Sequence, residues 1–307
     1  MKYSILFLLS IFLFLATRCE NEYATKVDLL SNMDTTANPA EDFYRYAAGG
    51  WIDSHPIPED ESDYDVTIEI QRKVDKQIVD IINDLRAHKQ KPESNKDIIV
   101  RFFNSGIDTA KTYSDGLKPL QFLFDSIDNI KSKSDLQNGI AILQKYCINA
   151  PLDFECGPNP TNTNYFICKI FDYGMALYDR EYYLNDNYSE IIDTYKQHIE
   201  KMMLLFGLDS TISKQSANAI YNIEHEIAKI TPTGNSSLFS SKSLEMSFDD
   251  LSAATTIDWE KLFTQIDCPK PKRILLCCGL EYIQGLTKLL ETIPTDDWKI
   301  YFKYSSS

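Results

Sequence analysis

The chain has 307 residues, 43% of them hydrophobic, and a formal net charge of −14 at pH 7. This apolar content is enough for a sizeable core in one large domain or two small ones. The acidic balance argues against nucleic-acid binding, which needs a basic surface. It also argues against docking of the folded surface on anionic lipid, and its simplest consequence is solubility.

The N-terminus has the pattern of an export signal. One lysine precedes an apolar run at 5–16, interrupted only by Ser10, which is too short for a membrane span of ordinary length. We therefore assign residues 1–19 to a signal peptide or lipoprotein signal, and 20–37 to a linker. Cys19 is a candidate lipidation site, although Arg18 stands where lipoprotein signals carry a small residue. The chain could be a lipoprotein, a secreted protein or a protein with an uncleaved N-terminal anchor, and the sequence leaves these three alternatives open. The expected location is periplasmic, outer-membrane or cell-surface.

The spacing of apolar residues predicts a mainly helical chain. Before residue 150, four helices are expected. Two of them cover 67–85 and 117–130. The other two begin at an N-cap, Ser94, and at a capping box formed by Ser134 and Gln137. After residue 180, apolar stripes predict helices over 192–206, 220–230, 259–266 and 280–293.

Between these two groups the pattern changes from helix to strand. Residues 152–173 read as one small β-hairpin, whose strands are separated by the turn-rich stretch "GPNPTNT". The fold class predicted from the sequence is thus mainly α, a multi-helix lobe with one small hairpin. Residues 234–243 read as a polar loop.

The sequence has seven cysteines, and an exported chain can oxidise them. Cys156 and Cys168 flank the predicted turn, so a disulfide could bridge it. Buried free thiols that pack as small hydrophobes fit the pattern equally well. No CxxC pair is present, which argues against a zinc ribbon.

One string invites a metal interpretation. "HEIAK", from His225 to Lys229, begins like the H-E-x-x-H helix of zinc peptidases, in which two histidines on one helix face bind the metal. Lys229 replaces the second histidine, and an ammonium does not bind zinc as imidazole does. Glu245 and Asp249 have E-x-x-x-D spacing but complete no ligand set. We therefore assign no catalytic and no metal-binding residue, and interpret His225 as part of a solvated helix surface.

Three blocks carry a family resemblance. The stretch "NPAEDFYRYAAGGWIDSHPIPED" at 38–60 resembles the N-terminal signature of the neprilysin family of zinc endopeptidases, which includes the endothelin-converting enzymes and oligopeptidase O. "GMALYDREYYL" and "PTDDWKIYFKY" resemble two later blocks of that family, in the same order. The matching residues, to which we give structural roles, are Asp42, Phe43, Tyr44, Gly49, Trp51, Pro56, Pro58, Asp179, Arg180, Tyr182, Tyr183 and Trp298.

The sequence also departs from the family pattern. Ala48 stands where many animal members have a cysteine, and Tyr178 where the second block usually has proline. The stretch 234–247 lacks the arginines that the family carries there. We expect 38–60 to be ordered, with Trp51 mostly buried.

The resemblance implies that residues 38–304 form the N-terminal helical domain of a neprilysin-like peptidase, part of the wall of its substrate chamber, with 305–307 as a tail. It also implies that the chain stops before the family's zinc motifs. Zinc is then expected only in the missing catalytic domain, and this chain is not proteolytic alone. The expected partners are peptides, or a catalytic lobe supplied in trans. We expect the chain to contact the membrane only through the N-terminal signal or a lipid. Residues from about Asp296 onward should be frayed.

Two alternatives to the truncated peptidase stay open. One is a stand-alone, non-enzymatic exported protein that binds peptides or a partner. The other is a helical surface lipoprotein that binds glycans or peptides, for which the 18 tyrosines offer stacking surfaces but suit a core equally well.

Overall fold

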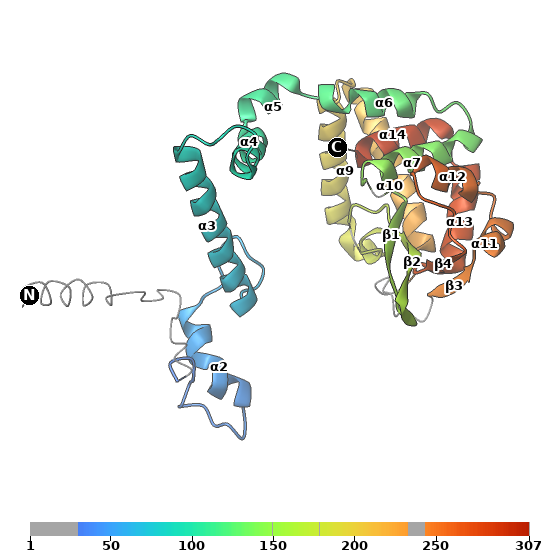
Figure 1. Ribbon diagram of the computed structural model, residues 1–307. Coiled ribbons are helices and arrows are strands. Elements are labelled where there is room, and N and C mark those ends of the chain that lie inside the picture. The colour runs from blue at the N-terminus through green and yellow to red at the C-terminus, as the bar shows by residue number, and fades with distance from the viewer. Residues whose placement is uncertain (1–29, 149, 178, 233–242, 307) are drawn as a thin grey trace, which may run out of the picture. The chain divides into compact units, whose positions relative to one another are not determined.

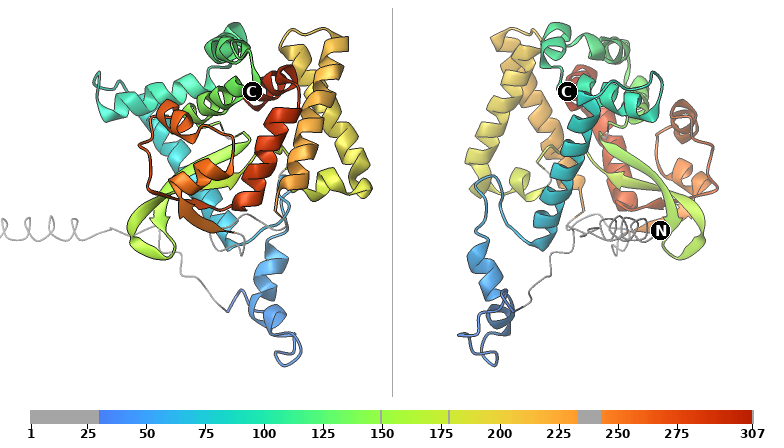
Figure 2. Two further views of the ribbon diagram at one scale, coloured as in Figure 1. Left: turned by 90° about the vertical axis from the view of Figure 1, so that its right-hand side faces the viewer. Right: turned by 60° about the vertical axis from the view of Figure 1, so that its left-hand side comes forward.

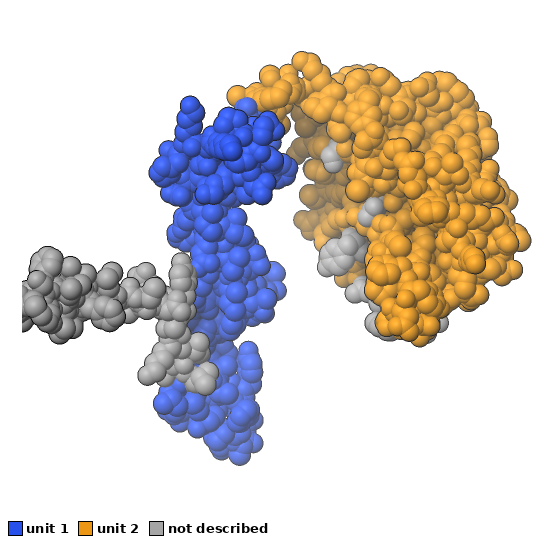
Figure 3. Space-filling model, in the orientation of Figure 1, with its two compact units in different colours: residues 1–108 blue, residues 109–307 orange. Residues whose placement is uncertain are grey.

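The computed structural model describes residues 30–148, 150–177, 179–232 and 243–306 (Figure 1). The chain divides into two compact units, residues 1–108 and 109–307 (Figure 3). The predicted signal at 1–19, with Cys19, lies outside the described residues, as does almost all of the predicted loop at 234–243. In the part that is described, no helix is long and apolar enough to cross a membrane.

The described part of unit 1 consists of three helices, α2 Phe43–Ser54, α3 Val66–Ala87 and α4 Asn95–Ile107. Each begins at a side chain that accepts a hydrogen bond from a backbone N–H of the first turn. These N-caps are Asp42, Asp65 and Ser94, so the cap predicted at Ser94 is confirmed.

Unit 2 is mainly helical, which confirms the predicted fold class. Its helices are α5 Thr109–Asp115, α6 Gln121–Asp128, α7 Leu136–Lys145, α8 Glu181–Leu184, α9 Ser189–Leu205, α10 Ser210–Ile230, α11 Phe248–Ala254, α12 Trp259–Gln265, α13 Gly279–Thr292 and α14 Thr295–Ser305. Short 3₁₀ turns occupy Lys118–Leu120, Lys133–Asp135 and Asp186–Tyr188.

The capping box before α7 lies elsewhere than predicted. The carboxylate of Asp135 accepts hydrogen bonds from the backbone N–H and the hydroxyl of Ser132, at 3.1 and 2.7 Å. Gln137, which was predicted to close the box with Ser134, instead accepts a hydrogen bond from the backbone of Asp258. The spacing rule found the helix start within two residues but could not anticipate that distant partner.

The sheet is larger than the single hairpin that the sequence predicts. Strands β1 Leu152–Asn159 and β2 Asn162–Asp172 form that hairpin, and most of the turn-rich stretch "GPNPTNT" belongs to the strands rather than to the turn. Strand β4 Arg273–Leu276 lies parallel to β2, and β3 Leu244–Ser247 pairs antiparallel with β4, so the order is β1-β2-β4-β3. One face of the sheet, including Ile170, packs into the main core.

Helix α10 lies at the centre of unit 2. It contacts α8, α9, α13 and α14, and α9 runs beside it (Figure 2). Its stripe of Ile220, Ile223 and Ile227 is at most 1% exposed, which is why the 3–4 spacing of these residues reads so clearly in the sequence.

Helix α14 contradicts the prediction of a frayed end. It packs against α6, α7, α9 and α10, and Trp298, Tyr301 and Phe302 are fully buried, with exposures of 1% or less. The expected absence of packing partners was wrong, because helices from elsewhere in this chain cover the aromatic face. The buried indole N–H of Trp298 has no hydrogen-bond partner among the described residues.

We predict that Trp298→Ala lowers the free energy of unfolding by about 3–5 kcal/mol, the usual cost of deleting a large buried aromatic. Urea denaturation measures it. Tyr113→Ala is the control, because Tyr113 is 90% exposed and its loss should change stability by less than about 0.5 kcal/mol. Equal effects of the two substitutions would contradict the packing of α14.

Candidate functional site

A buried carboxylate interrupts the apolar face of α10. Glu224 is 2% exposed and lies on the same face as Ile220 and Ile227. A carboxylate in such a place is costly unless hydrogen bonds satisfy it. Glu224 and Lys169, each 2% exposed, are the two charged residues buried among those that the structure describes.

Two tyrosines from two other helices satisfy this carboxylate. The hydroxyl of Tyr183, on α8, donates to Oε2 of Glu224 at 2.9 Å. The hydroxyl of Tyr195, on α9, lies 2.9 Å from Oε1 and 2.8 Å from Oε2. A backbone hydrogen bond at Ala176 adds a third partner. The carboxylate thus joins α8, α9 and α10.

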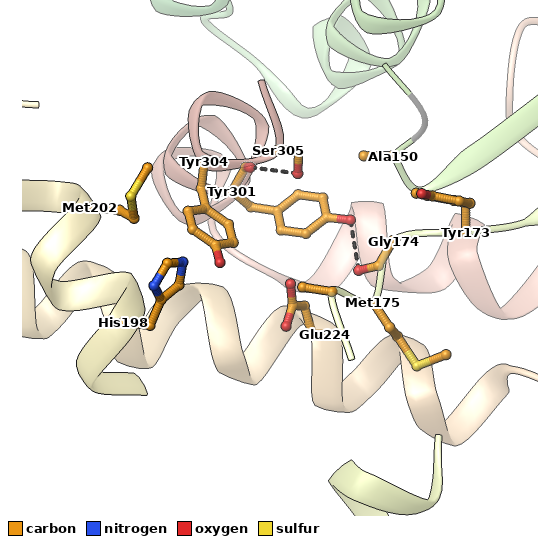
Figure 4. A pocket seen from close by; sticks show the side chains of 11 residues that line it. Ala150, Tyr173, Gly174, Met175, His198, Met202, Glu224, Tyr301, Tyr304 and Ser305 are labelled. Atoms are coloured by element: carbon orange, nitrogen blue, oxygen red, sulfur yellow. Dashed lines mark hydrogen bonds between the residues drawn. The ribbon is translucent and has the colours of Figure 1, made fainter. Parts of the chain in front are cut away.

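Glu224 also lines a cavity of about 330 Å³ (Figure 4). His198 and Met202 of α9 line it, together with Tyr301 and Tyr304 of α14. The other lining residues are Ala150, Tyr173, Gly174, Met175, Ala176 and Ser305. The wall therefore combines a carboxylate, an imidazole and phenols with apolar side chains, which suits a small polar molecule or ordered water.

A glycine brings the chain close to this cavity. Gly174 has φ +108°, in the left-handed region, and a Cβ there would lie 2.5 Å from the hydroxyl of Tyr301. That hydroxyl donates to the carbonyl oxygen of Gly174 at 2.9 Å (Figure 4). Only glycine fits here without strain, so the first residue of the second signature block is fixed by packing.

Burial changes the ionisation of the cluster. It raises the pKa of Glu224 to about 7, although the hydrogen bonds from Tyr195 and Tyr183 favour the ionised form. Burial, and next the neighbouring Glu224, raise the pKa of both tyrosines. The phenols therefore stay neutral donors, and the carboxyl group is close to half-ionised at neutral pH.

The second signature block holds α10 at two points. Nη1 of Arg180 donates to the carbonyl oxygen of Thr231 at 2.6 Å, beside the C-terminus of α10 where a cation is favoured. Tyr183 reaches Glu224 nearer the middle of that helix.

The other signature residues of unit 2 make local contacts or lie in the core. Asp179 accepts a hydrogen bond from the backbone of Glu181 at 2.9 Å. The ring of Tyr182 lies 4.9 Å from that of Tyr188, and Trp298 of the third block is in the core with α10.

The first signature block lies in unit 1. Trp51 is mostly covered, as expected, and stacks on His55 and Tyr64 with ring centroids 4.5 and 6.0 Å apart. Phe43 and Tyr44 are 68% and 73% exposed. The aromatics of this block therefore do not form a core within their own unit.

The glycines and prolines of this block differ in burial. Gly49 is buried, and a Cβ there would lie 2.6 Å from the Cβ of Asp34, so the glycine allows the segment before α2 to approach the helix. Pro56 is exposed and Pro58 half-buried, in the segment that follows α2.

The H-E-x-x-K string has no zinc geometry. The ring of His225 stacks on that of Tyr221, 5.8 Å away, and its side chain is 30% exposed, so it is half-buried rather than fully solvated. Burial lowers the pKa of His225. Nζ of Lys229 lies 2.6 Å from Oε1 of Glu226, which already neutralises that carboxylate. Among the described residues, no group of three or more His, Cys, Asp or Glu side chains could hold a metal ion.

Glu224 is the residue that sequence reasoning missed. It stands one place before His225 and four after Ile220, on the isoleucine stripe. A carboxylate on an apolar stripe is itself a signal of a buried, hydrogen-bonded group. The next residues, from His225 to Lys229, resemble a zinc motif only superficially.

Solved structures define the class of this fold. The zinc metalloprotease Zmp1 of Mycobacterium tuberculosis, in complex with an inhibitor, matches 90% of this chain and 43% of its own, with a TM-score of 0.78 and 19% identity. PepO from Lactobacillus rhamnosis matches with a TM-score of 0.67 and 14% identity. The chain thus has the fold of a part of these two proteins, less than half of each.

Sequence comparison gives the family. The model of peptidase family M13, for its N-terminal part, matches residues 39–306, and the chain belongs to that family. An endothelin-converting enzyme homolog of Locusta migratoria is 27% identical over 213 residues, which are 66% of this chain and 29% of the relative. Human endothelin-converting enzyme-like 1 is 22% identical over 287 residues, 87% of this chain and 36% of its own. The chain spans about a third of the curated relatives that it matches. The neprilysin-like resemblance is confirmed.

We predict a specific pH dependence from Glu224. Its pKa is about 7 in the folded state against an ordinary value of 4.5, so between these pH values the folded protein binds more protons than the unfolded chain. The stability of the wild type relative to Glu224→Gln should therefore fall by roughly 3 kcal/mol as pH rises from 4 to 8, and level off above 7. Urea denaturation of both proteins across this range measures the difference, in which other titrating groups cancel. A constant difference would mean that the carboxyl group titrates as in the unfolded chain.

Proposed function

We propose that residues 39–306 serve as the substrate-chamber lobe of a zinc metalloendopeptidase, and that residues 1–307 alone do not hydrolyse peptides. The match of the M13 N-terminal model over this range carries the proposal. In this reading the lobe encloses peptide substrate, and the chemistry takes place on residues outside these 307.

The positions of the histidines support the proposal that the catalytic residues lie outside these 307. The sequence has four, at positions 55, 88, 198 and 225, and no two are four residues apart. An H-E-x-x-H helix therefore cannot be formed within this sequence. We place the zinc ligands and the general base in a catalytic lobe, supplied either by further sequence or by a second polypeptide. Reading the DNA that follows codon 307 for an H-E-x-x-H sequence tests the first possibility.

We predict that the purified 307-residue protein binds less than one-tenth of an equivalent of zinc at neutral pH. We also predict no zinc-dependent cleavage of fluorogenic peptides, because Lys229 occupies the second ligand position. Metal analysis after dialysis, with a peptidase assay with and without added zinc, measures both.

His225→Ala is the matched variant for this experiment. If one equivalent of zinc binds the wild type and is lost in the variant, the H-E-x-x-K string is a metal site and the proposal fails. Peptide hydrolysis that survives in His225→Ala would place a catalytic centre elsewhere in these residues, which also contradicts the proposal. A stand-alone binding protein would share the inactivity, but no contact among the described residues specifically favours it.

We further propose that the chain is exported, on the evidence of the apolar run at 5–16. Within this proposal Cys19 is the lipidation candidate, residues 1–19 are the signal, and a linker separates the signal from the lobe. Intact mass of the protein made in a bacterial host tests it. Loss of the first 18 residues with added lipid that disappears in Cys19→Ala indicates a lipoprotein; a lipid-free cleaved chain indicates secretion. An uncleaved chain in the cytoplasm contradicts export.

A further inference from the structure

Two cysteines face each other across the β-hairpin. The register of β1 and β2 pairs Cys156 directly with Cys168. Directly opposed residues of an antiparallel pair point to the same face of the sheet, with Cβ atoms about 4.5–5.5 Å apart. A disulfide requires Cα atoms about 4.4–6.8 Å apart and Cβ atoms about 3.5–4.5 Å apart, so the pairing brings the two residues within a small adjustment of bonding geometry.

The same face of the hairpin packs on the core. Phe154 and Ile170 neighbour the two cysteines at even spacing, and Phe154 contacts Phe263 of α12 edge-on, with ring centroids 5.8 Å apart. Cys156 is exposed, whereas Cys168 is half-buried. Solvent therefore reaches Cys156 more readily than Cys168.

A third thiol lies close to this pair. Cys268 follows α12 and, with Cys156, raises the pKa of Cys168, which burial brings to about 12. The Sγ of Cys268 lies 3.7 Å from the carbonyl oxygen of the adjacent Pro269, as a weak S–H donor. Its own backbone N–H donates to Phe263. These contacts hold Cys268 in place, and no strand pairing places it opposite Cys156 or Cys168. We therefore do not assign Cys268 to the pair.

We propose that Cys156 and Cys168 are an oxidation site, which closes to a disulfide across the hairpin while Cys268 stays reduced. The oxidant is a disulfide, either a small molecule or an enzyme of an oxidising compartment. The Cys156 thiolate attacks one sulfur of that disulfide and releases the first thiol. The Cys168 thiolate then attacks the Sγ of Cys156 and displaces the second thiol. Two protein thiols lose two electrons and two protons, and the oxidant becomes two thiols.

The bond would fix the register of the hairpin. It closes a loop of 13 residues from 156 to 168, including the turn between β1 and β2. Closing a loop of this size restricts the unfolded chain, and the effect should be visible as a rise in Tm on the order of 5 °C. The high pKa of Cys168 makes its thiolate scarce at neutral pH, so oxidation should accelerate as pH rises.

The test uses the full 307-residue protein after incubation with oxidised glutathione. Free thiols are alkylated, and the protein is digested with chymotrypsin, which cleaves after Tyr165 or Phe166 between the two cysteines. We expect a disulfide-linked pair of peptides that contain Cys156 and Cys168, two fewer alkylated thiols than in the reduced protein, and a lower Tm after reduction.

Three variants separate the outcomes. Cys156→Ser, at an exposed position, should abolish the linked peptides and the Tm difference between oxidised and reduced protein. Cys147→Ser, at another exposed cysteine, should leave both unchanged, as should Cys268→Ser. A linked Cys168–Cys268 pair would overturn the proposal. Full alkylation of all thiols after oxidation at pH 8.5 would also overturn it.

Discussion

The arrangement of unit 2 depends on the hydrogen bonds that the buried carboxylate of Glu224 accepts. This carboxylate lies in the apolar face of the central helix α10, and its only strong partners among the described residues are the hydroxyls of Tyr183 and Tyr195, with the backbone at Ala176. A buried carboxylate without these donors would cost several kcal/mol. The helices that carry the donors must therefore keep their position on α10, and the cavity beside them follows from that position.

This constraint gives the signature blocks a physical meaning. Arg180 and Tyr183 of the second block contact α10 at its end and near its middle, and Gly174 lets Tyr301 of α14 approach the same place. Residues that a family resemblance marks only as matching are thus the contacts that assemble one lobe around one helix. The first block is different, because two of its aromatics, Phe43 and Tyr44, remain largely exposed in unit 1.

The sequence predicted those elements whose signal is local. The stripe of Ile220, Ile223 and Ile227, the N-cap at Ser94 and the hairpin at 152–173 all depend on neighbouring residues. Strands β3 and β4 were missed because each has four residues and its partners lie far along the chain. The packing of α14 and the role of Glu224 were missed for the same reason: the groups that cover Trp298 and that satisfy the carboxylate come from distant helices.

A double-mutant cycle between Glu224 and Tyr195 tests this account most directly. The unfolding free energies of the wild type, Glu224→Gln, Tyr195→Phe and the double variant are measured at pH 8, where the carboxyl group is mostly ionised. We expect a coupling free energy of about 1.5–3 kcal/mol, as for hydrogen bonds to a charged group, and none when Tyr113→Phe replaces Tyr195→Phe. A coupling below about 0.5 kcal/mol would show that the carboxylate does not hold α9 on α10, and would contradict the account.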